Sequence, residues 1–166
     1  QALNTMVERN PSTDLRLFVQ AVIINNAGLL EPIGPAGSQS HAAIIASVTV
    51  NVAAVLALSN AFIAATQHVP DRRMIHISSG AARSPYAGWN IYCATKASLD
   101  HHVRCLALEQ HQGLRAESLA PGVIDTEMQA QVRATSLEQF PMRRKFDDLK
   151  SSGALASPAS VAKQLI

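Results

Sequence analysis

Tyr92 and Lys96 lie four positions apart in a segment whose pattern predicts a helix, so both side chains emerge on the same face. Ser79 stands thirteen residues before Tyr92, directly after the apolar run MIHIS. A tyrosine with an ordinary pKa of about 10 is a poor base at neutral pH, but a nearby lysine ammonium favours the phenolate and lowers that pKa. These residue types at this spacing predict a site where a tyrosine exchanges a proton with a ligand oxygen.

The elements expected around these residues place them at one crevice. Short apolar runs predict buried strands at 21–25 and 74–78, and a third strand is expected near 114–119, after the helix that ends near Gly113. Helices over about 40–67 and 92–110 separate the strands. Strands that alternate with helices indicate a parallel α/β sheet with right-handed crossovers. Because open sheets of this kind bind ligands at the carboxyl ends of their strands, Ser79 and Tyr92 should face the same crevice.

The outer segments carry weaker signals. Residues 1–18 show a weak helical pattern broken by Asn10 and Pro11. After Pro121 and Gly122 the chain turns polar and is predicted to be helical through Lys150. Ser157 and Pro158 then form a favourable helix start, because serine suits the N-cap and proline the first helical position.

The length and composition of the chain are those of a single domain. Its 166 residues and 48% hydrophobic content suffice for one substantial core. The net charge of +2 arises without any block of like charges, and the basic cluster Arg143, Arg144 and Lys145 is typical of a solvated helix face. Because nucleic-acid binding requires a basic footprint, we expect no nucleic-acid partner.

Cysteine usage and one apolar segment bear on where the protein works. Cys93 and Cys105 are too few for a disulfide framework and fall in one expected helix, which favours a cytoplasmic location. The Ala-rich segment from Ala42 to Ala65 has the length of a membrane span, but Asn51 and Asn60 interrupt it. A buried helix is the better interpretation, so we expect no membrane partner.

Two other chemistries are disfavoured. The six histidines show no HxxxH or HExxH spacing and no cysteine pair accompanies them, so we expect no metal. A serine hydrolase would need a glycine two residues before its nucleophile, and Ile77 occupies that place for Ser79.

The candidate residues form part of an ordered series of four motifs. They are Asn25-Asn26-Ala27-Gly28, Ser79, Tyr92-Cys93-Ala94-Thr95-Lys96 and the segment from Pro121 to Thr126. In this order, each on the expected element, they resemble the successive motifs of the short-chain dehydrogenase/reductase family over about residues 21–166. The resemblance implies a Rossmann-like doubly wound parallel sheet, here incomplete, with residues 1–166 as a single partial oxidoreductase domain.

The resemblance also implies roles for the polar residues. Tyr92 would be the general acid/base, Ser79 would hydrogen-bond the substrate oxygen, and Lys96 would bind the nicotinamide ribose and lower the pKa of Tyr92. Asn51 matches a family position at which an asparagine holds a water in the proton relay. Its alternative interpretation is a buried polar side chain satisfied by packing partners.

The implied cofactor is NADP or NAD, with NADP favoured, and the implied reaction is hydride transfer to or from a small carbonyl or alcohol. The residues expected to contact the cofactor are Asn26, Ala27, Gly28, Tyr92, Lys96, Pro121, Gly122, Ile124 and Thr126. Those expected to contact the substrate are Ser79, Trp89, Met128 and Phe140. The helix at 40–67, which is apolar nearly all round, and the helix that bears Tyr92 are expected to pack against a second copy, giving a homodimer or homotetramer.

Two further segments resemble one branch of the family. Leu29-Leu30-Glu31-Pro32 and the run from Asp125 to Gln129 are similar to the branch that contains sepiapterin reductase and benzil reductase. This resemblance implies an NADPH-dependent reductase of small dicarbonyl or aromatic ketone substrates.

The chain also departs from the family pattern. It lacks the glycine-rich turn that holds the cofactor pyrophosphate, and the charged residue that selects between NAD and NADP. In the family order 3-2-1-4-5-6 its first strand corresponds to the fourth, which leaves an apolar edge unpaired, and the last strand is also missing. Since Gln1 is not an initiator methionine, we expect the functional protein to carry upstream residues. The alternative is a catalytically inactive fragment or a binding or scaffold module of the same fold.

Overall fold

The computed structural model describes residues 18–165, and its centre is a three-stranded parallel sheet. Strands β1 (Gln20–Asn25), β2 (Asp71–Ile77) and β3 (Leu114–Leu119) lie in that order. Gln20 pairs with Asp71 and Arg72 pairs with Leu114, so the three strands start level with one another. The parallel α/β sheet predicted from alternating strand and helix patterns is confirmed, and residues 1–17 lie outside the described part.

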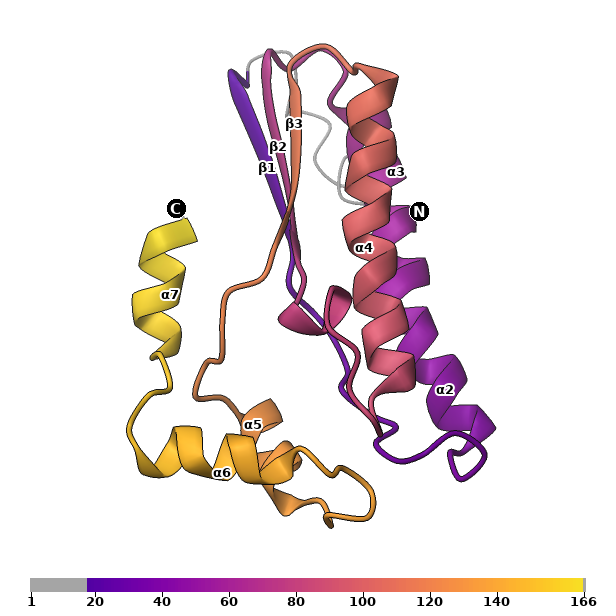
Figure 1. Ribbon diagram of the computed structural model, residues 1–166. Coiled ribbons are helices and arrows are strands. Elements are labelled where there is room, and N and C mark those ends of the chain that lie inside the picture. Colours follow the sequence, from indigo (N-terminus) through magenta and orange to yellow (C-terminus); the bar gives the residue numbers. More distant parts are fainter. Residues whose placement is uncertain (1–17, 166) are drawn as a thin grey trace, which may run out of the picture.

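Helices make the connections between the strands (Figure 1). The first connection is one long helix made of α2 (His41–Val48), a π-helical turn η2 (Thr49–Ala53) and α3 (Ala54–Ala65). The second is a short 3-10 turn η3 (Gly80–Ala82) followed by α4 (Asn90–Glu109). Both long helices were predicted to within two residues at each end.

Three short helices follow β3. They are α5 (Glu127–Ala134), α6 (Arg143–Ser151) and α7 (Pro158–Leu165). The Ser157 hydroxyl accepts a hydrogen bond of 3.1 Å from the Ser160 amide, which confirms the predicted helix start. The polar stretch predicted as helical through Lys150 is instead two helices separated by a loop, with buried Phe140 in that loop.

Helices α3 and α4 cover one face of the sheet (Figure 1), where Phe62, Met74 and Leu106 form a buried cluster. On the opposite face Val22 and Ile24 of β1 remain 49% and 43% exposed. The strand predicted to be buried is therefore buried on one face only in the described part of the chain. As expected, β1 lies at an edge of the sheet.

Strand β2 begins three residues earlier than its apolar pattern predicted. Its first residues, Asp71 to Arg73, are charged, but each finds a partner across the sheet or at the strand ends. Asp71 accepts hydrogen bonds from Arg115 on β3 at 2.6 Å and from Gln20 on β1 at 2.7 Å. Buried Arg72 donates to the carbonyl of Gln112. Cross-strand ion pairs thus extend the ladder beyond the hydrophobic residues.

An aromatic cluster joins the segments after β3 to the start of α4. Trp89 stacks on Phe140 at 4.3 Å between ring centroids, and Phe146 of α6 lies 5.4 Å from Trp89. Gly88 allows this contact, because a Cβ there would stand 2.2 Å from the carbonyl oxygen of Gln139 and its φ is +87°. The cluster holds α5 and α6 against the end of the sheet that carries the site.

The helix from His41 to Ala65 is long and apolar enough to cross a membrane, with a mean hydropathy of 2.1 over its most apolar window. Its buried positions, however, carry Ser47, Asn51 and Ser59 together with Val55 and Phe62, and they face the rest of the protein. Polar side chains that are satisfied inside a fold are typical of a packed helix.

A buried chain of hydrogen bonds links the sheet to α4. The Asn25 amide lies 3.0 Å from His76 Nδ1, and His76 Nε2 lies 3.1 Å from His102 Nδ1. His76 is fully buried on β2, and burial together with the neighbouring His102 lowers its pKa from 6.5 to about 4. His76 is therefore neutral in the folded protein at neutral pH.

This burial makes stability depend on pH. Because His76 has a lower pKa folded than unfolded, the unfolded chain binds more protons below pH 6.5, and its stabilising contribution is lost as pH falls from 6.5 towards about 4. We expect the free energy of unfolding from urea titrations to fall between pH 7 and pH 5. His76→Phe should flatten this slope, whereas His68→Gln, at an exposed position, should leave it unchanged. A wild-type slope that His76→Phe does not alter would contradict the assignment.

Candidate active site

Ser79 and Tyr92 meet at the carboxyl end of β2. Ser79 follows the strand in extended conformation and caps η3, where its Oγ accepts a hydrogen bond of 3.2 Å from the Ala81 amide. Tyr92 lies in the first turn of α4 and is 6% exposed. The two side chains lie close enough for Ser79 to lower the pKa of Tyr92 by hydrogen bonding.

Lys96 lies one helical turn beyond Tyr92 and is also buried. Its Nζ donates a hydrogen bond of 2.7 Å to the Ile77 carbonyl oxygen and stands 5.7 Å from the Tyr92 ring centroid. Burial lowers the pKa of Lys96 from 10.5 to about 8. An ammonium has three donors, so two remain after the bond to Ile77. A Cβ placed on Gly28 would lie 3.4 Å from this Nζ, so the loop after β1 borders the lysine.

The pKa of Tyr92 moves in the direction opposite to the one expected. Burial raises it, hydrogen bonding with Ser79 opposes the rise, and Lys96 is not among the groups that shift it. The expectation that Lys96 lowers the pKa of Tyr92 is therefore wrong for this chain by itself. The lysine Nζ donates its hydrogen bond to the Ile77 carbonyl and lies over the Tyr92 ring. Tyr92 consequently keeps its proton at neutral pH.

Asn51 ties three elements together from the π-helical turn. Its Oδ1 accepts a 2.7 Å hydrogen bond from the Leu29 amide, and its Nδ2 donates one of 2.7 Å to the Leu29 carbonyl. Nδ2 also lies 3.2 Å from the Thr95 hydroxyl of α4. Both ends of the amide are thus occupied by protein partners, and the side chain is 1% exposed. The water relay proposed for Asn51 stays a prediction. A π-helical turn is often found at functional sites.

The predicted cofactor residues lie in two loops at the same edge of the sheet as Ser79, because the strands are parallel and in register. Asn26 and Ala27 are exposed after β1, and Gly28 is half-buried. After β3 the segment from Pro121 to Thr126 is held by the Asp125 amide, which donates to the Ala156 carbonyl at 2.9 Å. In this segment Gly122 and Thr126 are exposed, whereas Pro121 and Ile124 are half-buried. The structure therefore brings these loops to one edge, with the Thr126 hydroxyl open to solvent.

The four predicted substrate residues divide into two groups. Ser79 and Met128 lie beside the Tyr92 hydroxyl, with the Met128 sulfur at 4.0 Å from it. Trp89 and Phe140 are 5% and 0% exposed and stack on each other in the core, and Trp89 packs edge-on against Tyr92 at 5.6 Å. They form a wall behind Tyr92 and do not line an open space.

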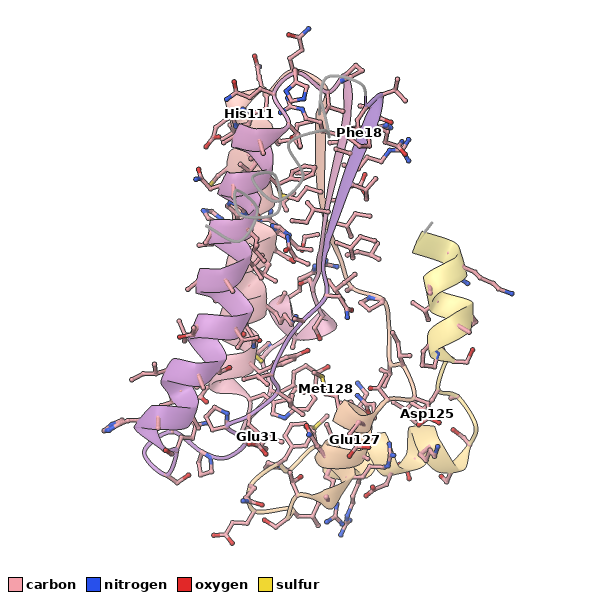
Figure 2. All side chains as sticks on the ribbon, turned by 180° about the vertical axis from the view of Figure 1, so that it is seen from behind. Phe18, Glu31, His111, Asp125, Glu127 and Met128 are labelled. Carbon is pink, nitrogen blue, oxygen red and sulfur yellow. The ribbon has the colours of Figure 1, made fainter. Side chains whose placement is uncertain are left out.

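A cavity of about 330 Å³ opens beside Met128, between the loop after β1, helix α2 and helix α5. Figure 2 shows Glu31, Glu127 and Met128 in this region. Its lining residues that were not predicted as site residues are Leu29, Leu30, Glu31, Ala43, Ala46, Glu127 and Gln131. Glu127 and Gln131 share the i, i+4 spacing of one helix face, which is the local signal that could have found them. No group of His, Cys, Asp or Glu able to hold a metal ion occurs within residues 18–165.

The comparisons with known proteins decide the family. The family model for short chain dehydrogenases matches residues 19–137. The chain belongs to the short-chain dehydrogenase family. The benzil reductase ((S)-benzoin forming) of Bacillus cereus is 40% identical over 147 residues, which are 86% of this chain and 59% of that protein. The sepiapterin reductase of Mus musculus is 34% identical over 149 residues, 87% of this chain and 56% of that protein.

Solved structures agree with this short-chain dehydrogenase fold. The KRED1-Pglu enzyme superposes with a TM-score of 0.83 at 28% identity, over 96% of this chain and 65% of that one. A candidate NAD(P) dependent gluconate 5-dehydrogenase from Beutenbergia cavernae was solved with bound NADP at low occupancy. It superposes with a TM-score of 0.72 at 27% identity, over 93% of this chain and 59% of that one. The chain thus has the predicted Rossmann-like fold and spans less than two thirds of the length of these relatives.

Asn51 provides a test of how the site is held together. Replacing it with alanine removes the two hydrogen bonds to the Leu29 backbone and the one to Thr95, and each lost hydrogen bond costs about 0.5 to 1.5 kcal/mol. We expect Asn51→Ala to lower the free energy of unfolding by about 1.5 to 4.5 kcal/mol in urea titrations. Ser59→Ala is the matched control, because the fully buried Ser59 hydroxyl bonds only to Val55 of its own helix. Equal losses in the two variants would contradict the role of Asn51.

Proposed function

We propose that the chain forms the catalytic half of an NAD(P)-dependent oxidoreductase that reduces a small carbonyl compound to an alcohol. The observation that carries the proposal is the buried Tyr92 hydroxyl, which lies beside Ser79 and Met128, and Met128 in turn lines a cavity. Its raised pKa keeps the phenol protonated, so Tyr92 suits the role of proton donor to a carbonyl oxygen. A protonated phenol is the form that carbonyl reduction requires.

The residues around Tyr92 fit the nicotinamide end of a cofactor. Lys96 has two spare donors beside Gly28, at the place where ribose hydroxyls would need them. Asn26, Ala27 and the Thr126 hydroxyl are exposed on the flanking loops. When bound, a nicotinamide cofactor supplies the hydride. We favour NADP over NAD because the Beutenbergia cavernae structure holds NADP.

The protein's own residues then control orientation and the proton. Ser79 would hydrogen-bond the substrate oxygen, and Tyr92 would donate its proton to that oxygen as the alcohol forms. Lys96, whose pKa is lowered by burial to about 8, would supply the proton that restores the Tyr92 phenol after each reaction. Asn51 would support this relay by holding the loop at Leu29, which borders the cavity. Benzil and sepiapterin reductases among the relatives support small dicarbonyl or aromatic ketone substrates.

The proton-donor role can be tested in the full-length protein. Tyr92→Phe should lower kcat for ketone reduction by about 100-fold or more, because the general acid is lost. The affinity for NADPH, followed by its fluorescence, should stay within about threefold, since Lys96 and the loops are retained. Tyr86→Phe makes the same change in the same aromatic cluster, away from the proton path, and should keep kcat. Full turnover by Tyr92→Phe would contradict the assignment, and turnover by neither wild type nor variant would favour an inactive module.

We further propose that the protein works as a homodimer or homotetramer through its long helix. Ile45 and Val48 are 67% and 42% exposed on α2 and lie three positions apart, hence on one side of the helix. Leu58 of α3 and Leu108 of α4 add further exposed apolar surface. A second copy of the chain is the partner most consistent with the family's expected oligomers.

Light scattering coupled to gel filtration tests the oligomer. We expect the wild-type mass to equal two or four chains at micromolar concentration, and Ile45→Glu/Val48→Glu to reduce it to one. Asn60→Glu, at an exposed polar position of the same long helix, should leave the oligomer intact. A monomeric wild type would refute the proposal.

The free cysteines and the basic cluster of α6 bear on the location of the protein and on nucleic-acid binding. We place the protein in the cytoplasm because Cys93 and Cys105 are both free thiols. No nucleic-acid partner is proposed, since Arg143 pairs with Asp147 and Lys145 lies over the Tyr86 ring. The basic cluster of α6 is thus partly engaged within the protein.

A further inference from the structure

A second cavity adjoins the one beside Met128. It has a volume of about 410 Å³ and shares Glu31 and Gln131 with the first. The first compartment, next to the Tyr92 and Met128 pair, is lined mainly by Leu29, Leu30 and two alanines. The second offers neutral hydrogen-bonding groups, which are Ser38, Gln39, Ser40, Gln131, Thr135 and Gln139. We call the two compartments together the groove; it lies along α5, and Met128, which lines the first compartment, connects it to the Tyr92 hydroxyl.

All the charged side chains that line this groove are negative. Of all the residues that line the two compartments, only Glu31 and Glu127 carry charged side chains, and both are exposed carboxylates. Within residues 18–165, neither has a cationic partner within 4.0 Å. In Figure 2 the two residues lie at the same end of the molecule as Met128. A substrate in the groove therefore meets two carboxylates that form no ion pair with the described residues.

Glu127 also has a structural role. It is the first residue of α5, where a carboxylate interacts favourably with the helix N-terminus. That role predicts a small loss of stability on substitution but no effect on the choice among substrates. Glu31, in contrast, lies in the loop after β1 and in the lining of both compartments. Measuring which substrates a variant accepts therefore distinguishes a role in specificity from a role in stability alone.

We propose that Glu31 and Glu127 set substrate charge, so that the groove accepts neutral or cationic ketones and rejects those whose far end carries a carboxylate or phosphate. This inference rests on the proposed function, because it takes the ketone to be held next to Tyr92. The apolar compartment would hold the aryl or alkyl group beside the carbonyl, and the neutral polar groups would hold the far end. A carboxylate there would be repelled by Glu31, which lines both compartments, and by Glu127, which lines the adjoining one.

The test compares two acetophenones of the same shape, one with a para carboxamide and one with a para carboxylate. For the full-length protein with NADPH, kcat/KM is measured for each ketone, and calorimetry gives each affinity in the presence of NADP⁺. We expect the amide to be favoured about tenfold or more in both measurements at low salt, the effect expected for two nearby screened charges. Raising the salt should reduce the preference, because ions screen exposed carboxylates.

Substitutions then assign the effect to the two residues. Glu31→Gln/Glu127→Gln keeps the shape of the groove and should bring the two ketones to within about threefold. Glu117→Gln removes the same charge from an exposed position on β3, outside both compartments, and should keep the wild-type preference. Thermal unfolding of each variant shows whether the glutamine substitutions leave the protein folded.

The outcomes separate this inference from the proposed function. If neither ketone is reduced but the amide still binds more tightly, the proposed reaction fails and the charge selection stands. Equal affinity for both ketones in the wild type, an unchanged preference in the double variant, or no binding of the amide at millimolar concentration would each overturn the inference.

Discussion

The paired hydrogen bonds between Asn51 and the backbone of Leu29 are the interaction on which the site depends. They fix the loop after β1 to the long helix, and the contact of the same amide with Thr95 extends the link to α4. The π-helical turn places this asparagine where it reaches both segments. Since Gly28 borders Lys96, and Leu29 and Leu30 line the cavity, the link also sets the position of the substrate space.

The proton chemistry at Tyr92 follows from what lies behind it. Trp89 packs edge-on against the tyrosine ring, and Phe140 and Phe146 back Trp89 from the segments after β3. This wall removes water from Tyr92, and burial is the largest cause of its raised pKa. The C-terminal segments therefore do more than close the fold, because they supply the environment that keeps the phenol protonated.

Local patterns predicted much of this arrangement and missed what depends on distant packing. Strand and helix patterns predicted the three described strands and both long helices. The order of the four motifs predicted that Ser79, Tyr92 and Lys96 lie at one edge of the sheet, where the parallel register places the strand ends. The start of β2 escaped prediction because its charged residues are satisfied across the sheet. The raised pKa of Tyr92 escaped it too, since spacing reveals the nearby lysine but not the direction of its Nζ or the burial by Trp89. That Glu31 lines the cavity could not be predicted either, because the cavity forms where the loop after β1 packs near α5, and local sequence patterns do not show such a contact.

In the proposed function, the groups that would handle the proton lie apart from those that would meet the rest of the substrate. Tyr92 and Lys96 are buried on α4, and Lys96 is bonded to the end of β2, so substitutions there disturb packing as well as chemistry. Glu31 and Glu127 are exposed on a loop and at a helix start, where a change of side chain costs little stability. Substrate preference can therefore change through the exposed groove residues while the buried residues keep the same reaction.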